Sequence, residues 1–415
     1  MTCLSIRRSL CFLGLFGAFA TASACTTEEA APAADNITSV AQSGIRRQSI
    51  GNCWIYAVLG WVESVNIRAT GVDPNLSESY LTYWHWFDQI QEGIPVGNQL
   101  ETGGHFGDAD RLISTYGMMK EGDFIFQERR AEESARQKTA LAAIQAALAT
   151  GALKTQDARY DRKLLRAELD KAFQLTSTAT NRLDAVFGKS VDRTLKTTTA
   201  DLKAQKIIAP SALPAASAKP DGSVQIVTLA DLLPNNGRLP YTPVSFPYLS
   251  TPDSPAERAF WRRVKKALHA QAPVVAVWDV DFNALTTTAH FSKAYLDTRG
   301  PGKQGGHMTV ASDYQAVLAN GTRYAAGTPV TDPAIVASLM QDDTKVEFLR
   351  VKNSWGAYRP DRWLDASLPG YHDLDIDYIR GPLKKCQAKP DGSTDTANCP
   401  TTGPGMRTVY VPNGF

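Results

Sequence analysis

The chain has 415 residues, of which 43% are hydrophobic, 21% charged and 9% aromatic, and this composition excludes collagen-like, low-complexity and wholly disordered chains. Its 44 Lys and Arg residues against 42 Asp and Glu residues give a net charge of +2, which provides no overall electrostatic reason to bind nucleic acid. At this length we expect two lobes, or one domain with a large insertion, and a function that resides in a local site.

Residues 1–24 have the pattern of an export signal. Arg7 and Arg8 form a positively charged start, residues 10–20 are apolar apart from their glycines, and residues 22–24 offer a small-residue cleavage site. The apolar run is too short for a transmembrane helix, which needs about 20 apolar residues. We therefore expect the protein to be exported.

Cys25 follows this cleavage site and resembles the cysteine of a bacterial lipobox, which becomes a lipidated first residue. The match is incomplete because Ala22 stands where a large aliphatic residue is usual. Two alternatives stay open: the mature chain is secreted or periplasmic, or a lipid on Cys25 holds it at a membrane surface as a lipoprotein. Residues 25–43 lack any helical or strand period and are expected to form a tether.

The rest of the chain divides into segments of different pattern. Apolar residues at helical spacing after Cys53 predict a helix that begins at or near that residue. We expect strands at 224–227 and 273–278, a helix over 256–269, and an excursion from the strands at 318–343. The expected segments are a helical lobe at 44–127, a charged helical insertion at 128–208, a Pro-containing linker at 209–222, a strand-rich lobe at 223–384 and a tail at 385–415.

The cysteines predict one disulfide and one free thiol. Cys386 and Cys399 lie 13 residues apart in a stretch rich in turn-forming residues, and an oxidising compartment favours their pairing. Closing such a loop contributes roughly 3 kcal/mol in the chain-entropy model. Cys53 then remains as the odd thiol and the candidate reactive group. No Cys and His residues have zinc-ligand spacing, so we expect no metal site.

The residues around Cys53 are suited to thiol chemistry. The positive end of a helix and a neighbouring imidazolium both lower the pKa of a cysteine. Gly51 leaves room for a substrate backbone to approach the sulfur. The backbone N–H of Cys53 and the side-chain amide of Gln48 are candidates to hold the oxyanion of a tetrahedral intermediate.

Residues 48–57 (QSIGNCWIYA) resemble the active-site segment of papain-like cysteine peptidases, including the bleomycin hydrolase branch. Two further segments match in the same chain order. Residues 306–314 (GHMTVASDY) are similar to the family's histidine strand, and residues 351–356 (VKNSWG) to its Asn-Ser-Trp-Gly segment. The resemblance implies an α+β, two-lobed papain-like fold, with a helical left lobe and a β-barrel-like right lobe.

Carried over residue by residue, the resemblance makes Cys53 the nucleophile and His307 the base that takes its proton and later protonates the leaving amine. Asn353 would orient the imidazole, and Trp355 would shield the His–Asn hydrogen bond from water. The implied reaction is hydrolysis of peptide bonds through an acyl-enzyme thioester, on a peptide or protein substrate and without a cofactor. The oligomeric state stays open.

Two parts of the resemblance are weaker. Gly103 and Gly104 match a glycine pair that contacts substrate backbone in relatives. The oxyanion Gln of relatives stands six residues before the Cys, whereas Gln48 stands five before Cys53 and Arg47 takes the sixth place. Either the loop is one residue shorter or the donor is lost. We favour the shorter loop, because the amide needs only to come within hydrogen-bond reach.

Other functions stay open. The chain could be a catalytically inactive papain-like module that binds peptides or cell-wall stems, a transglutaminase-like acyl transferase, or a structural lipoprotein. Among the histidines, His290 is the rival catalytic base but lies in no family-like segment. His85 is expected to pack among aromatic residues, and His105 borders the glycine pair, where it is a candidate to line the cleft.

Overall fold

The computed structural model describes residues 40–93, 99–234, 241–248, 250–359, 364–389 and 393–415. These residues belong to one compact unit, Asp35–Phe415. The predicted export signal and Cys25 lie outside the described residues. Within the described ranges, no helix has both the length and the apolar character needed to cross a membrane.

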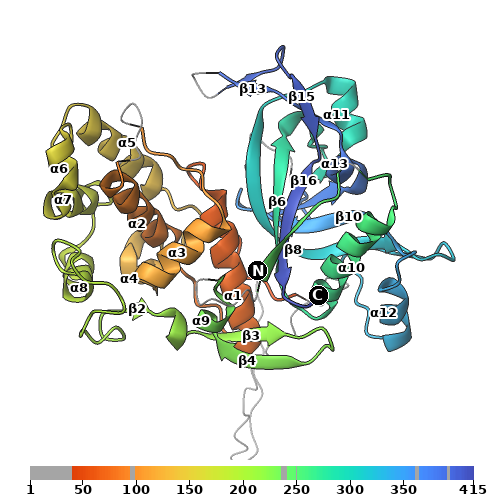
Figure 1. The fold of residues 1–415 in the computed structure, drawn as a ribbon, viewed down its shortest axis with the longest axis horizontal. Coiled ribbons are helices and arrows are strands. Elements are labelled where there is room, and N and C mark those ends of the chain that lie inside the picture. Colours follow the sequence, from red (N-terminus) through yellow and green to blue (C-terminus); the bar gives the residue numbers. More distant parts are fainter. Residues whose placement is uncertain (1–39, 94–98, 235–240, 249, 360–363, 390–392) are drawn as a thin grey trace, which may run out of the picture. The chain divides into compact units, whose positions relative to one another are not determined.

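The first half of the described chain is mainly helical, as the red to yellow part of Figure 1 shows. Its helices are α1 (Cys53–Thr70), α2 (Glu78–Gln91), α3 (Phe106–Tyr116), α4 (Glu121–Phe124), the 3-10 turn η1 (Phe126–Glu128), α5 (Arg136–Ala149), α6 (Gln156–Tyr160), α7 (Arg162–Ala172) and α8 (Ser177–Phe187). Helices α5 to α8 lie within the predicted insertion. Strands β1 (Met118–Met119) and β2 (Ile207–Ile208) pair, so the chain returns after the insertion to a place close to the end of α3.

Helix α1 is enclosed by protein along most of its length. All of its residues from Cys53 to Asn66 are buried, and the polar ones, Glu63, Ser64 and Asn66, have hydrogen-bond partners within the protein. It ends at Gly71, whose φ of 74° and N–H bond to the Ile67 carbonyl form a left-handed cap. The predicted helix start is confirmed, because α1 begins at Cys53. The cysteine therefore lies at the positive end of the helix.

The second half is built on one large sheet, green to blue in Figure 1. Its strand order is β5-β16-β6-β8-β10-β11-β7, and β9 also pairs with β8. Neighbours are antiparallel except β11 and β7, which run parallel. The strands are β5 (Tyr241–Ser245), β6 (Val274–Asp281), β7 (His290–Phe291), β8 (Gln304–Val317), β9 (Arg323–Tyr324), β10 (Lys345–Lys352), β11 (Tyr371–Asp375) and β16 (Met406–Pro412).

Helices and 3-10 turns precede or connect these strands. They are η2 (Pro210–Ala212), α9 (Leu229–Leu232), α10 (Pro255–His269), η4 (Phe282–Ala284), α11 (Lys293–Arg299), α12 (Pro333–Leu339) and α13 (Ile376–Arg380). Ser254 caps α10 by accepting from the Glu257 N–H, with Pro255 in the first helical turn. The predicted helix over 256–269 and strand over 273–278 are thus confirmed as α10 and β6.

The sheet and α1 share one hydrophobic core. Val275 of β6 and Met308 and Val310 of β8 belong to the same buried cluster as the apolar residues of α1. A second buried cluster contains the apolar residues of α10 together with Trp278 and Trp355. Strand β8 therefore lies at the junction between the helical half and the sheet, with residues in contact with each.

The predicted linker contains a strand. Strands β3 (Pro214–Ala218) and β4 (Val224–Thr228) form an antiparallel hairpin, and β3 falls inside residues 209–222. The Asn66 side chain on α1 donates to the Pro214 carbonyl at 2.7 Å. Small side chains in β3, including the buried Ala215, let the hairpin lie close against the helix. Proline and small residues here serve packing as well as chain reversal.

The end of the predicted tether is also packed. Val40 is 3% exposed and belongs to the second core cluster. The Ser64 hydroxyl on α1 donates to the Ala41 carbonyl. The Lys352 ammonium donates to the Ser43 hydroxyl at 2.7 Å. Residues 40–43 are therefore held against the fold by contacts with both halves.

The tail forms two small hairpins near the start of β8. Strand β12 (Leu383–Lys385) pairs with β15 (Thr401–Gly403), and β13 (Gln387–Ala388) pairs with β14 (Thr394–Asp395). The predicted disulfide between Cys386 and Cys399 is present. We call these four strands the C-terminal flap.

Candidate active site

The thiol of Cys53 is buried in the first turn of α1, with 9% of the residue exposed. Burial raises the pKa of this thiol to about 11, because it penalises the charged thiolate. Backbone N–H groups, first that of Met308 and then those of Trp54 and Cys53 itself, act in the opposite direction. Met308 directly follows His307, and β8 packs against α1 in the buried cluster that contains both Met308 and Cys53.

His307 lies on β8, and its Nε2 is 2.7 Å from Oδ1 of Asn353, which follows β10. The backbone N–H of Ser354 also donates to this Oδ1, at 2.8 Å. Since the oxygen accepts both bonds, the hydrogen of the imidazole resides on Nε2, and Nδ1 is the nitrogen able to take up a proton. The His307–Asn353 contact expected from the sequence is therefore present in the structure.

Hydrogen bonds hold both the backbone and the side chain of Asn353. Its backbone N–H donates to the Gly370 carbonyl at 2.8 Å. Its side-chain Nδ2 lies 3.2 Å from Nδ1 of His372, a buried residue of β11. Asn353 thus stands between two imidazoles, one at each end of its carboxamide. Sequence reasoning missed His372, because its role depends on β11 pairing beside β10 and no local motif marks it.

Two tryptophan rings pack against the imidazole of His307. The ring of Trp355 stacks on the imidazole with 4.9 Å between centroids and 21° between planes. The ring of Trp278 meets it edge-on at 5.3 Å. Trp355 is 4% exposed, so it covers the His307–Asn353 pair as the sequence predicts. Trp278 was missed, because it occupies an ordinary strand position opposite His307 in the β6–β8 register.

Gln48 bridges the loop before Cys53 and the segment after Asn353. Its Nε2 donates to the Ile50 carbonyl at 2.7 Å. Its Oε1 accepts from the Ser354 hydroxyl, and its backbone N–H donates to the Ser354 carbonyl at 2.9 Å. One hydrogen of the amide is thus engaged within the Cys53 loop, and the other is the one that could reach an oxyanion.

The glycine segments lie together beside Trp54, the neighbour of Cys53. A Cβ on Gly104 would stand 2.5 Å from the Trp54 ring, and one on Gly51 would stand 2.9 Å from the Thr102 hydroxyl. The Trp54 indole N–H donates to the Thr102 carbonyl at 2.9 Å. Gly103 is exposed and has open space around it. The structure therefore brings the predicted glycine pair next to the Cys53 loop.

The other histidines lie in different surroundings. His290 on β7 pairs with Asp375 at 2.8 Å, which raises the pKa of its imidazole. His85 is buried and meets Trp54 edge-on at 4.9 Å, so its predicted aromatic packing is confirmed. Burial lowers the pKa of His85 to about 4. His105 is the exposed first-turn cap of α3, where it forms a capping box with Asp108.

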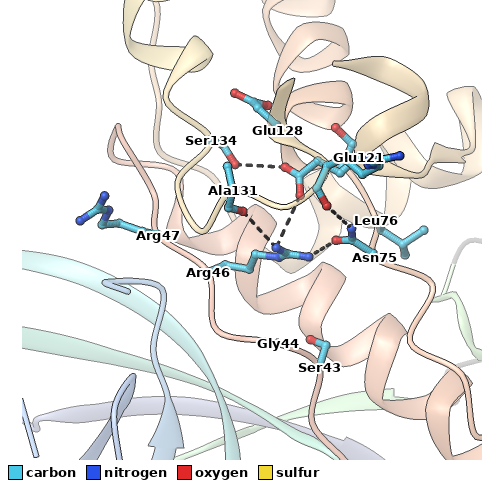
Figure 2. Close-up of polar contacts among 12 residues, drawn as sticks. Ser43, Gly44, Arg46, Arg47, Asn75, Leu76, Glu121, Glu128, Ala131 and Ser134 are labelled. Atoms are coloured by element: carbon cyan, nitrogen blue, oxygen red, sulfur yellow. Dashed lines mark hydrogen bonds and ion pairs between the residues drawn. The ribbon is translucent and has the colours of Figure 1, made fainter. Parts of the chain in front are cut away.

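A buried ionic cluster lies beside the Asn353 segment. Its acidic members Glu63, Glu78, Glu121 and Glu128 are at most 5% exposed. Figure 2 shows Arg46 between Glu121 and Asn75, where it also donates to the Ala131 carbonyl at 3.2 Å. Burial raises the pKa of Glu78 to about 7 and that of Glu121 to about 10, in spite of the opposing charge of Arg46.

Lys352 connects this cluster to the site. It directly precedes Asn353, and burial lowers the pKa of its ammonium while Glu63 raises it. A cavity of about 20 Å³ is lined by Glu63, Glu78, Lys352 and Asn353, among others. The arrangement fixes the chain on the N-terminal side of Asn353, because Lys352 is held between the carboxylates and Ser43.

Comparisons with known proteins give distant likenesses. No protein-family model matches the chain, and no curated protein matches it. The crystal structure of PepW from Lactobacillus rhamnosis HN001 (DR20) is similar with a TM-score of 0.40 and 13% identity, over 92% of this chain and 82% of that one. Xylellain, a cysteine protease from Xylella fastidiosa, gives a TM-score of 0.34 and 11% identity, over 91% of this chain and 85% of that one. At these scores the functional assignment depends on the site itself.

Proposed function

We propose that the protein is a papain-like cysteine peptidase that hydrolyses peptide bonds through an acyl-enzyme thioester. The observation that supports this most directly is the arrangement at α1 and β8. The His307 Nε2 bonds to Asn353 under the Trp355 ring, and Met308, the next residue of β8, lies in the same buried cluster as Cys53. Nucleophile, base and orienting amide thus come from three distant parts of the sequence.

The proposed reaction uses these groups in order. Nδ1 of His307 takes the thiol proton of Cys53. The resulting imidazolium forms an ion pair with the thiolate, and this attraction offsets the free-energy cost of a buried negative charge. The thiolate attacks the peptide carbonyl, and the Cys53 N–H at the helix start stabilises the oxyanion, with Gln48 as second donor. His307 then gives its proton to the leaving amine, and water hydrolyses the thioester.

The first experiment is labelling of the purified chain with an epoxide that alkylates catalytic thiols. We expect stoichiometric labelling of Cys53, none in Cys53→Ala and a strong loss in His307→Ala. His290→Ala is the matched control and should label like the wild type. Labelling that depended on His290 and not on His307 would contradict the assignment of the base. Equal, slow labelling of Cys53 in the wild type, His307→Ala and His290→Ala would indicate an inactive module.

The second experiment identifies the product. Incubation with peptides and a primary amine distinguishes hydrolysis, which adds water to the acyl fragment, from acyl transfer, which adds the amine. Mass spectrometry should find the hydrolysed product in excess. We also propose export, as the sequence of residues 1–24 suggests. The mass of the mature N-terminus would show whether Cys25 carries a lipid.

A further inference from the structure

A cavity of about 470 Å³ lies between the C-terminal flap and the beginning of β8. Its floor includes the pair formed by Asp279 of β6 and Gly306 of β8. The next same-face pair along these strands is Val277 with Met308, and Met308 belongs to the buried cluster that contains Cys53 and the other apolar residues of α1. Two residues along a strand span ~7 Å. The cavity thus begins about two strand residues from the part of β8 that packs against α1.

Gly305 and Gly306 leave the floor of this cavity open. Both are exposed, and a Cβ on either would meet nothing within 4 Å. Strand β10 pairs with β8 only from Val310 onward, so it does not cover these two residues. An extended chain lying across the site therefore has room to approach the β8 backbone here.

The flap is attached to β8 through Gln304, three residues before His307. Its Nε2 donates to the Lys384 carbonyl at 2.7 Å, and its Oε1 accepts from the Cys386 N–H at 2.9 Å. Its own backbone N–H donates to the Thr394 hydroxyl at 2.9 Å. The disulfide of Cys386 joins the same part of the flap. The wall of the cavity is thus built from bonds to both flap hairpins.

Three basic and two acidic residues line the cavity. Asp279, whose side chain is 12% exposed, is paired with Lys385 at 2.6 Å and with Arg407, whose side chain is 56% exposed. Asp281 is buried and accepts from the Gly302 N–H and from Gln304. Both carboxylates are therefore engaged within the protein. Lys384 is exposed, and Arg407 keeps 56% of its side chain exposed although its guanidinium forms two hydrogen bonds to Asp279.

We propose that this cavity is a substrate subsite that recognises a carboxylate, in the form of an acidic side chain or a free chain end within a few residues of the bond that is cut. The inference rests on the proposed peptidase function. Lys384 and Arg407 are its specificity-determining residues, and the flap with its disulfide holds Lys384 in place.

The test uses pools of acetylated hexapeptides in which one position is fixed as Glu, Gln or Lys and the others vary. At one fixed position, we expect the wild-type chain to cleave the Glu pool about fivefold or more faster than the Lys pool. A difference of this size corresponds to a single charge pair near a protein surface. The fixed position at which this happens tells whether the carboxylate lies before or after the bond. Amidated and free-acid pools separate an acidic side chain from a chain end.

Two variants test the roles of Lys384 and Arg407. Lys384→Glu should abolish or reverse the preference, and Arg407→Gln should reduce it while Lys385 still pairs with Asp279. Lys189→Glu, an equal charge change at an exposed position of the helical half, is the control and should keep it. A wild type without preference for carboxylates, or a preference that survives both Lys384→Glu and Arg407→Gln, would overturn the inference.

Binding separates this inference from the proposed function. If the wild type cleaves no pool, the peptidase proposal fails, but the same pools can be bound to the Cys53→Ala chain without turnover. If Cys53→Ala binds Glu pools more tightly than Lys pools, and the double variant Cys53→Ala/Lys384→Glu does not, the subsite is supported independently of peptidase activity. Equal binding of both pools would refute it.

Discussion

The ring of Trp355 stacks on His307 at 4.9 Å between centroids, and the imidazole is bonded at 2.7 Å to Asn353 two residues before that tryptophan. One short segment after β10 therefore supplies both the partner of the imidazole and its cover. A water-free environment strengthens such a bond and holds the ring in one orientation. Substitutions at Trp355 and Asn353 test this geometry.

Trp355→Ala should lower stability and turnover together. Removing a buried tryptophan costs about 3 to 5 kcal/mol, and loosening the imidazole by ~1.4 kcal/mol would lower kcat about tenfold. Trp355→Phe keeps an aromatic face and should retain more of both. Urea unfolding and peptide hydrolysis measure the two effects. Loss of stability with unchanged kcat would mean that the ring serves packing alone.

Asn353→Ala should lower kcat/KM by about a hundredfold, because the His307 ring loses its orienting partner. The decrease should appear in kcat more than in KM, since Asn353 does not touch the substrate in the proposed mechanism. His372→Ala is a graded comparison, because it removes the contact at the other end of the carboxamide. An Asn353→Ala enzyme with wild-type kcat would exclude the orienting role.

The pKa of Cys53 predicts a change in alkylation with pH. Burial raises this pKa to about 11, so without a proton acceptor the reactive thiolate forms only in strong alkali. In His307→Ala the rate of alkylation by iodoacetamide should therefore rise through pH 9 toward its limit near pH 11. The wild type should reach its plateau at much lower pH, because the thiolate forms as an ion pair with the imidazolium. Coincident profiles would contradict the pair.

The buried carboxylates predict a decrease in stability with rising pH. The pKa of Glu78 is raised to about 7 from an ordinary value of 4.5. Between these values the folded chain binds more protons than the unfolded chain, so the free energy of unfolding falls as pH rises. Glu78→Gln should show a smaller fall in stability between pH 5 and pH 8 in urea unfolding. The exposed Glu92→Gln is the control and should follow the wild type.

The disulfide of the C-terminal flap should stabilise the chain. Replacing both Cys386 and Cys399 with Ser should lower the free energy of unfolding by roughly 3 kcal/mol if the flap unfolds with the sheet. If the flap unfolds alone, global stability should stay unchanged, and hydrogen exchange should increase only in β12 to β15. Treating the wild type with dithiothreitol should reproduce whichever result the variant gives.

The sequence predicted the parts of the site that local patterns encode. The start of α1 follows from apolar residues at helical spacing after Cys53, and the His and Asn segments from their resemblance to those of papain-like cysteine peptidases. The disulfide followed from cysteine spacing in a turn-rich stretch. These signals are contained within a few neighbouring residues, which is why they could be recognised without a structure.

The remaining features depend on contacts between distant segments. His372 reaches Asn353 only through the register of β10 with β11, where Val351 stands opposite His372. Glu63 and Glu78 lie on separate helices, so nothing in their spacing indicates a shared buried cluster. The strand β3 was hidden by proline and small residues, which are typical of linkers and here permit contact with α1.

The bond between Ser43 and Lys352 sets a practical limit for producing this protein in shortened form. A version that begins at Gly44 would lack the hydroxyl that accepts from the ammonium group, and would also lose the buried side chain of Val40. Lys352 would then lose a hydrogen-bond partner and keep only the attraction of nearby carboxylates such as Glu63, Asp73 and Glu78. Recombinant forms intended for enzymology should therefore start upstream of Val40, and a protease site for tag removal belongs earlier still.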